Sequence, residues 1–444
     1  MYKTLSNKRE KEEGFKMEKV NNMQAKFQQM AYKISENKPL SAIADGLMSL
    51  MTIMIIGSIA VLIAVIQWGP WQTALEVIGI RPFLLGLNNM TNGIIAVYAT
   101  FAIAYQLATK LGKNAFNSGI LSLVVFFTLT PTASLYVDGI AEGNALPFQW
   151  LGATGLFSAI VISLVTTTLY SKIVDKGWVI KMPDGVPPMV SNSFSALIPG
   201  FTLAGIAVAI RFGLSLTGFE YIHNLIFQFI SGPLSLIGGN PFAVTFAFFI
   251  SAVLWFFGIH GMNILNATLN PILMPLQLEN LAAFEAGYAL PNMLVWQNVQ
   301  LFGSPGGSGA TLGLAFAMAF FAKSKQYKTL GKISLLPSLF GINEPLIFGF
   351  PLVLNFKTIV PFIATPVILF ATGVALVQFG IMPPATGVLT PLGTPFLVSG
   401  FIAGGWQYAA FQLFGAVFSF FMYVRVFKRL DKDVHEQEQI ENEN

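Results

Sequence analysis

Residues 338–355 read SLFGINEPLIFGFPLVLN, and they contain Glu344, the only acidic residue between Glu285 and Asp431. An ionisable side chain at membrane depth is costly to bury, faces the protein interior or a watery cavity, and marks a functional site. A proline follows this acid directly, and the stretch is too short to form two full spans. We therefore interpret it as a re-entrant hairpin that brings a carboxylate to polar cargo crossing the bilayer.

The composition around this hairpin is that of a membrane protein. Hydrophobic residues make up 54% of the 444 residues and charged residues only 10%, whereas soluble domains carry about 25% charged residues. Apolar stretches extend along the whole chain, and no cleavable signal peptide opens it. The chain has no Cys, which excludes disulfides, thiolate metal sites and a cysteine nucleophile. We expect an all-α polytopic membrane protein with no metal and no cofactor.

Intervals free of charged residues predict nine transmembrane helices, since a span needs about 20 residues. They lie near 46–67, 92–109, 115–136, 149–171, 199–219, 241–259, 301–322, 358–379 and 402–424. Residues 265–280 are rich in Pro and Asn and predict a partly re-entrant segment, with one further crossing before residue 301. The expected total is about ten transmembrane helices, with re-entrant hairpins and an interfacial amphipathic helix.

Basic residues predict the orientation, because cytoplasmic loops are enriched in Lys and Arg. Five segments hold 22 of the 25 basic residues, namely those before Asp45, at 110–113, at 172–181, at 323–332 and after Tyr423. We therefore place both termini in the cytoplasm.

Proline and glycine divide the chain into functional regions. Irregular backbone at membrane depth occurs only where it is buried in protein or lines a cavity, and broken helices mark transporter binding sites. The cargo site is therefore expected in the second half. The regions are a cytoplasmic amphipathic segment (1–40), an N-terminal transmembrane half (41–182, with the fifth span at 199–219), an amphipathic connector (183–200), a C-terminal transmembrane half (220–425) and a solvated acidic tail (426–444).

Three further features allow two interpretations each. His260, in LWFFGIHGMN, is either a ligand or a histidine hydrogen-bonded between helices. The glycine-rich run 303–313 lacks a Walker lysine and a preceding strand, so a flexible helix entry is favoured over a phosphate-binding loop. Arg211 is interpreted as reaching the membrane interface rather than binding cargo.

The run Gly341 to Gly349, GINEPLIFG, closely resembles the signature of the IIC component of the phosphoenolpyruvate-dependent sugar phosphotransferase system, in its lactose, cellobiose and diacetylchitobiose branch. Further landmarks support the resemblance, namely VPPMVSNSFSALIPG (186–200), WFFGIHG (255–261), GGSGATLGL (306–314) and GGWQ (404–407). It extends over roughly residues 25–430 and leaves only the tails outside.

The resemblance implies a homodimeric permease of the bacterial cell membrane, whose N-terminal half makes the dimer contact and whose C-terminal half binds a β-linked disaccharide. Glu344 and His260 carry over as the residues near the hydroxyl that receives phosphate, with a carboxylate suited to act as a base and an imidazole able to donate or accept. Further sugar contacts are expected from Asn343, Asn263, Trp255 and Thr394. Such a chain is the translocating subunit of a multi-component phosphotransferase, with the phosphocysteine donor on a separate IIB protein, charged in turn by IIA.

One position departs from the family pattern. Relatives carry a Trp-Thr-x-Pro motif after the last hairpin, and here Leu392 and Gly393 stand where Trp and Thr would be. Thr394 and Pro395 remain. If that tryptophan stacks on a sugar ring in the relatives, this chain lacks the platform, which leaves the identity of its disaccharide open.

An ion-coupled secondary transporter with Glu344 as its proton or cation site is the alternative, since broken helices suit it equally well. The transported product separates the two: a IIC permease delivers sugar phosphate, and a symporter delivers free sugar. A sugar receptor would need a signalling domain, and tails of about 40 and about 20 residues are too short for one.

Overall fold

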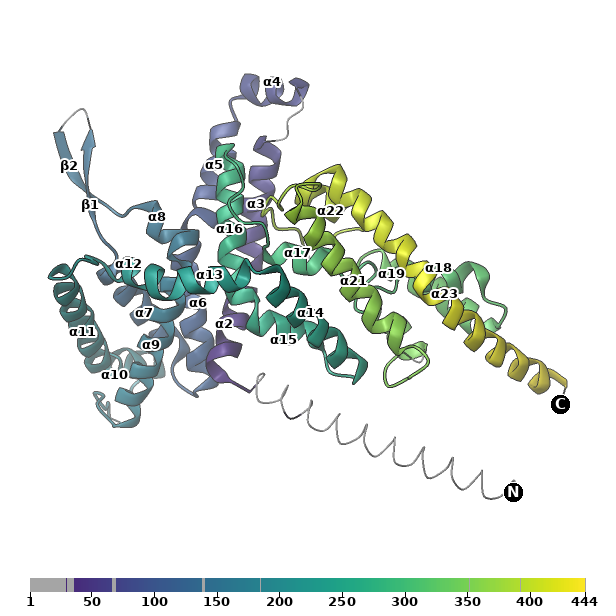
Figure 1. The fold of residues 1–444 in the computed structure, drawn as a ribbon. Coiled ribbons are helices and arrows are strands. Elements are labelled where there is room, and N and C mark those ends of the chain that lie inside the picture. The colour runs from purple at the N-terminus through teal and green to yellow at the C-terminus, as the bar shows by residue number, and fades with distance from the viewer. Residues whose placement is uncertain are drawn as a thin grey trace.

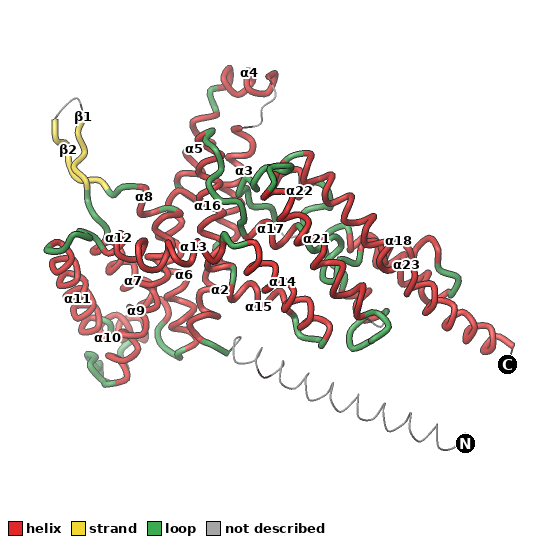
Figure 2. Tube along the Cα trace, viewed as in Figure 1, coloured by secondary structure: helices red, strands yellow, loops and turns green. Residues whose placement is uncertain are grey.

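The computed structural model describes residue 29 and residues 36–443, apart from 66–68, 138, 139, 184, 351 and 392. Most of the expected amphipathic segment at 1–40 therefore lies outside the described residues, as does Leu392. Helices dominate the described part, and a single two-stranded hairpin is its only sheet (Figure 2).

The first half is built from short and long helices with the hairpin inserted between them. Its elements are α2 (Lys38–Ser49), α3 (Met51–Val65), α4 (Gly69–Ile78), α5 (Arg81–Asn89), η1 (Asn92–Ile94), α6 (Ile95–Lys110), α7 (Ala115–Leu129), β1 (Ala133–Val137), β2 (Ile140–Ala145), α8 (Phe148–Leu151), η2 (Ala153–Gly155), α9 (Leu156–Asp175), α10 (Pro188–Ser195) and α11 (Leu197–Ser215).

The second half contains a larger number of short helices, together with the longest helix of the described residues. Its elements are α12 (Ile222–Ile226), the π-helix η3 (Phe227–Ser231), α13 (Gly232–Gly238), α14 (Pro241–Phe256), α15 (Gly261–Thr268), α16 (Asn270–Ala286), α17 (Trp296–Leu301), α18 (Leu312–Phe321), α19 (Lys325–Ser338), α20 (Glu344–Gly349), α21 (Ile359–Gln378), α22 (Val398–Gly404) and α23 (Trp406–Glu443).

Helices occupy all nine predicted spans, and the expectation of a helical membrane fold is confirmed. Within the described residues, five segments are long and apolar enough to cross a bilayer: Arg81–Lys110, Ala153–Asp175, Met189–Ser215, Ile359–Gln378 and Trp406–Glu441. The pair α2 and α3, bent by 43°, makes a sixth if it is counted as one span. Three shorter apolar helices, α7, α14 and α18, account for the remaining predictions.

Two of the predicted spans are shorter than expected. The span predicted at 115–136 ends at Leu129, and β1 follows and pairs antiparallel with β2. Pro131 explains this, because proline pushes the preceding residue out of the helical region, and Thr130 is extended, with φ −77° and ψ 133°. The span predicted at 301–322 is helical only from Leu312, after the glycine-rich run.

Residues 265–280 contain a break, as predicted, because α15 ends at Thr268 and α16 begins at Asn270. The re-entrant path of this segment stays a prediction. After the short α15, the chain forms one 17-residue helix, α16, with Pro275 inside it. Its polar residues are buried and bind irregular backbone: Asn280 Nδ2 donates to Ala385 O and Asn292 O, both at 2.8 Å, and Gln277 Oε1 accepts from Gln297 N at 2.8 Å. These residues indicate an interior helix.

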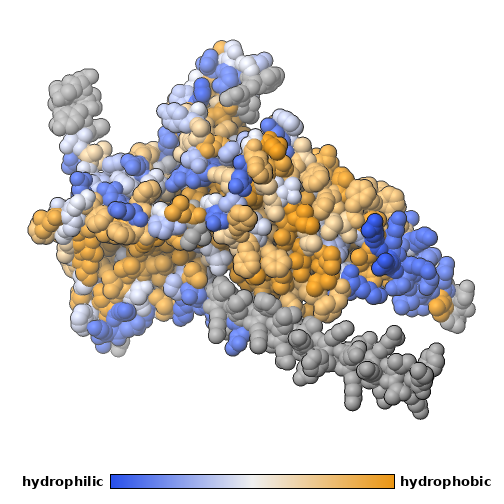
Figure 3. Space-filling model, viewed as in Figure 1, coloured by the Kyte–Doolittle hydropathy of each residue, from blue (hydrophilic) through white to orange (hydrophobic). Residues whose placement is uncertain are grey.

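Most of the first half lies at one end of the molecule and α18, α19 and α23 at the other, with α3 and α16 between them (Figure 1). Helix α12 of the second half packs against α9 and α11 of the first. In the first half, α6 packs against α2, α7 and α9, and in the second α23 packs against α18, α21 and α22. Hydrophobic side chains cover much of the visible face, whereas hydrophilic ones gather over the last turns of α23 (Figure 3).

Helix α23 is 38 residues long. The expected solvated tail at 426–444 is thus helical through Glu443.

Candidate functional site

Glu344 is the first residue of α20, a short helix that also carries buried apolar side chains. Gly341, with φ +77°, turns the chain into this helix, and Pro345 occupies its first turn, where a proline is tolerated. The opposite side of α20 is anchored by Leu346 and Ile347, which are 0% and 3% exposed. Glu344 itself is exposed. The short helix therefore presents its carboxylate on an accessible surface while its other side is fixed in the core.

Asn343 connects this helix to the glycine-rich run. Its Nδ2 donates to Ser308 O and to Thr311 Oγ1, each at 2.7 Å, and the side chain is 3% exposed. Gly307, with φ +93°, leaves no room for a side chain, since a Cβ there would lie 2.6 Å from Asn343 Oδ1. The run 303–313 is thus a closely packed support for the NEP motif. The structure places Asn343 behind Glu344 rather than on the accessible surface.

His260 lies between α14 and α15, whereas Glu344 begins α20. His260 precedes α15, and its Nδ1 accepts from Asn263 N at 3.3 Å, so Nε2 is the ring nitrogen available to a ligand. The ring packs against Trp255, with centroids 4.4 Å apart at 49°. Ile259, the residue before His260, packs against the apolar cluster that contains Leu346 and Ile347 of α20. The structure therefore places the two predicted central residues on neighbouring segments.

Two small cavities meet at Ser304, beside the glycine-rich run. One has a volume of about 140 Å³, and Gly341, Gln300 and Thr394 are among its lining residues; the other, of about 20 Å³, is lined in part by Trp255. Trp255 Nε1 is buried and lacks a hydrogen-bond partner among the described residues. A ligand acceptor would satisfy this indole donor.

Sequence reasoning missed Gln300 and Ser304, because nothing in the local pattern separates them from other polar residues of the second half. Gln300 is exposed at the end of α17 and lines the larger cavity. Gln412 also lines it, but its Oε1 accepts from Leu397 N (2.9 Å) and Gly400 N (3.2 Å), so this amide orders the surrounding backbone.

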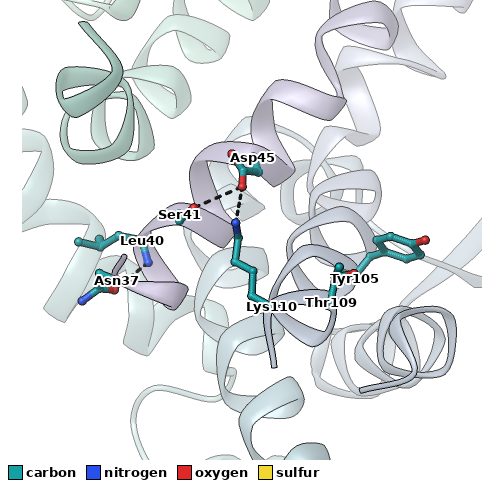
Figure 4. Close-up of polar contacts among 7 residues, drawn as sticks. All are labelled: Asn37, Leu40, Ser41, Asp45, Tyr105, Thr109 and Lys110. Atoms are coloured by element: carbon teal, nitrogen blue, oxygen red, sulfur yellow. Dashed lines mark hydrogen bonds and ion pairs between the residues drawn. The ribbon is translucent and has the colours of Figure 1, made fainter. Parts of the chain in front are cut away.

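Asn263 lies in a different cavity. A space of about 370 Å³ at the boundary between α2 and α15 is lined by Ser41, Asp45 and Asn263, among others. Asp45 pairs there with Lys110 Nζ at 2.6 Å and accepts from Ser41 Oγ at 3.3 Å (Figure 4). Of the predicted site residues, Glu344, His260, Trp255 and Thr394 thus lie around the glycine-rich run, and Asn263 faces the first half.

Comparison with known proteins identifies the family of this chain. The family described as "Phosphotransferase system, EIIC" matches residues 44–366. The chain is 35% identical to the lichenan permease IIC component of Bacillus subtilis (95% of this chain, 96% of that protein) and 35% identical to the cellobiose-specific EIIC component of Geobacillus stearothermophilus (92% and 94%).

Among solved structures, the chain matches the transporter ChbC, the IIC component of the N,N'-diacetylchitobiose-specific phosphotransferase system. The TM-score is 0.86 at 35% sequence identity, covering 93% of this chain and 98% of that one. The resemblance carried by GINEPLIFG and the other motifs is thereby confirmed. This chain is a multi-pass membrane protein that belongs to the EIIC family of the phosphotransferase system.

Proposed function

We propose that this protein is the IIC permease for a β-linked disaccharide of the cellobiose or diacetylchitobiose type. It carries the sugar across the bacterial membrane and presents it to a phosphorylated IIB protein. The names of the relatives support this substrate class. The observation that carries the proposal is that the segments of His260 and Glu344 pack in one apolar cluster. Gly341 and Trp255 from the same segments line cavities together with amides and hydroxyls.

The chemistry requires one base and several hydrogen-bonding groups. The Glu344 carboxylate accepts hydrogen bonds from sugar hydroxyls and takes the proton of the C6 hydroxyl as that oxygen attacks phosphorus. The bond from phosphorus to the IIB cysteine sulfur breaks, and the thiolate leaves with the electron pair. His260 Nε2 donates to or accepts from a neighbouring hydroxyl. Trp255 supplies an apolar face and its unpartnered N–H, while Asn343 keeps Glu344 in place.

The phosphocysteine belongs to the partner, since this chain has no Cys. IIA recharges IIB and acts on this chain only through it. The Lys and Arg distribution supports two cytoplasmic termini. A homodimer through the first half is supported by the segment Met189–Ser215. Only 17% of its most apolar 18-residue stretch is buried within this chain, so its apolar surface is open to a partner subunit.

Reconstitution tests the function. Proteoliposomes given IIB, IIA, the general phosphotransfer proteins and phosphoenolpyruvate should accumulate disaccharide phosphate. Omitting IIB is the matched control, and it should abolish accumulation while leaving sugar binding intact. Uptake of unmodified sugar driven by a proton or sodium gradient would overturn the proposal in favour of an ion-coupled transporter.

A further inference from the structure

The charged end of α23, residues 425–443, binds the start of α19. Asp431 is 3% exposed, and its two carboxylate oxygens accept from Lys323 N (2.8 Å), Ser324 N (3.1 Å) and Ser324 Oγ (2.7 Å). A buried carboxylate is stable only when such donors surround it. Asp431 is therefore buried and hydrogen-bonded within the fold, and the expectation of a solvated tail is wrong at this residue.

Glu438 continues the same contact two helical turns later. Its carboxylate accepts from Lys325 N at 2.8 Å and Gln326 N at 2.9 Å. The first N–H groups of a helix have no partner within that helix. Asp431 and Glu438 together supply acceptors for the four consecutive backbone N–H groups of residues 323–326, and Ser324 Oγ accepts from Tyr327 N at 3.3 Å. Residues 425–443 thus act as a clamp on the beginning of α19.

The clamp also reaches the segment that carries Glu344. Within one apolar cluster, Phe427 and Leu430 from α23 lie together with Leu346 and Ile347 from α20. On the far side of α20, Lys357 Nζ lies 3.5 Å from Asp433. The end of α23 therefore contacts the chain both before and after Glu344.

The same helix holds the glycine-rich run from the other direction. Tyr423 OH donates to Gly309 O at 2.7 Å, and Ser419 Oγ donates to Ala310 O and accepts from Gly313 N at 3.2 Å. That run in turn binds Asn343, the neighbour of Glu344. Helix α23 therefore contacts both segments that hold the Glu344 carboxylate, namely the α19–α20 segment and the glycine-rich run.

We propose that Asp431 and Glu438 are positioning residues for sugar phosphorylation, which fix the α19–α20 segment so that the Glu344 carboxylate meets the acceptor hydroxyl. This inference rests on the proposed function. The physical reason is that a misplacement of about 1 Å at a reacting group costs up to about 10²-fold in rate. Removing one carboxylate releases two of the four N–H groups and allows α19 to shift.

Two substitutions and two truncations test the inference in the full protein with its partners. Asp431→Asn and Glu438→Gln remove one charge each, and Glu441→Gln is the control, on an exposed residue of the same helix. A chain ending after Glu436 removes Glu438, and one ending after Ile440 keeps it. The measurements are kcat, the KM for phosphorylated IIB, the affinity for cellobiose by calorimetry, and thermal stability in detergent.

We expect Asp431→Asn to lower kcat about 10-fold and Glu438→Gln about 3-fold, which is part of the loss that misplacement allows. The KM for IIB and the behaviour of the controls should match the wild type. The chain ending after Glu436 should behave like Glu438→Gln, and it keeps the test valid if Asp431→Asn does not fold.

Each other outcome contradicts the inference in a recognisable way. Reduced thermal stability with unchanged kcat and cellobiose affinity would make the clamp purely structural. A raised KM for IIB alone would assign the tail to partner docking. In both cases the wild type still makes sugar phosphate and the proposed function stands. A wild type that neither binds nor phosphorylates any disaccharide overturns the proposed function and this inference together.

Discussion

The two halves of the molecule differ in how many amide side chains bind distant backbone. In the first half, α6 buries small apolar residues such as Ala96 and Ala99, and polar groups such as Ser163 bond within their own helix, here Oγ to Ile160 O at 2.9 Å. Bonds such as that from Asn92 Nδ2 to Met54 O, at 3.2 Å, are few in the described part of this half. In the second half, amide side chains reach backbone far away in sequence, as Gln297 Nε2 does to Val388 O at 2.8 Å. Where a helix is interrupted, side chains must replace its lost backbone partners.

The largest effect is expected at Glu344 in the second half, and it is a loss of sugar phosphorylation. Glu344→Gln keeps the size of the side chain but removes its basicity, so phosphorylation should fall more than about 10²-fold. Sugar binding should weaken less, because hydrogen bonds to a charged group are worth about 1.5–3 kcal/mol. Phosphorylation rate and calorimetric affinity measured on one preparation separate the two. Wild-type phosphorylation by the variant would make Glu344 structural.

Two histidines allow the proposed sugar site to be compared with the structural scaffold. His260 is exposed and precedes α15, whereas His223 is fully buried, stacked on Trp150 at 4.9 Å among residues of the first half. His260→Ala should cost about 1–3 kcal/mol of sugar affinity with little loss of stability. His223→Ala should lower the unfolding temperature and leave affinity unchanged. If His260→Ala binds sugar normally but is unstable, this histidine belongs to the scaffold instead.

A third pair of variants tests the difference in hydrogen bonding directly. Asn280→Ala leaves buried backbone groups of Ala385 and Asn292 without partners, which should cost about 1–3 kcal/mol of unfolding free energy. Ser163→Ala, equally buried in α9, should cost less than about 0.5 kcal/mol, since the Ile160 carbonyl keeps its helical bond. Thermal unfolding in one detergent compares them. Equal losses would refute the distinction between the halves.

The smallest effect is expected at the ion pair between α2 and α6. Asp45→Asn breaks the contact with Lys110, but the two side chains are 49% and 26% exposed. Pairs of this kind contribute about 0–1 kcal/mol. The unfolding temperature should therefore barely change, and sugar phosphorylation should stay at the wild-type rate. A loss of transport with normal stability would show that the cavity between α2 and α15, which Asp45 lines, matters to the transport motion.

The residues predicted as central could be singled out because each carries an improbable property for its place in the sequence. An acid in an apolar hairpin and a histidine at the end of an uncharged run are visible without a structure. Gln300, Ser304 and the role of Asp431 were not visible, because their meaning depends on which distant backbone groups they meet. The same holds for the interior position of α16, which depends on the partners of Asn280 at residues 385 and 292.

Because α23 is one unbroken helix, its C-terminal end is rigidly connected to the residues that contact the glycine-rich run. At about 1.5 Å per residue, its 38 residues span roughly 57 Å, nearly twice the hydrocarbon thickness of about 30 Å. A stiff rod of this length converts a small tilt near the glycine-rich run into a larger displacement at its end. A fluorophore attached near Glu443 would therefore report movements of the sugar site from well outside the bilayer.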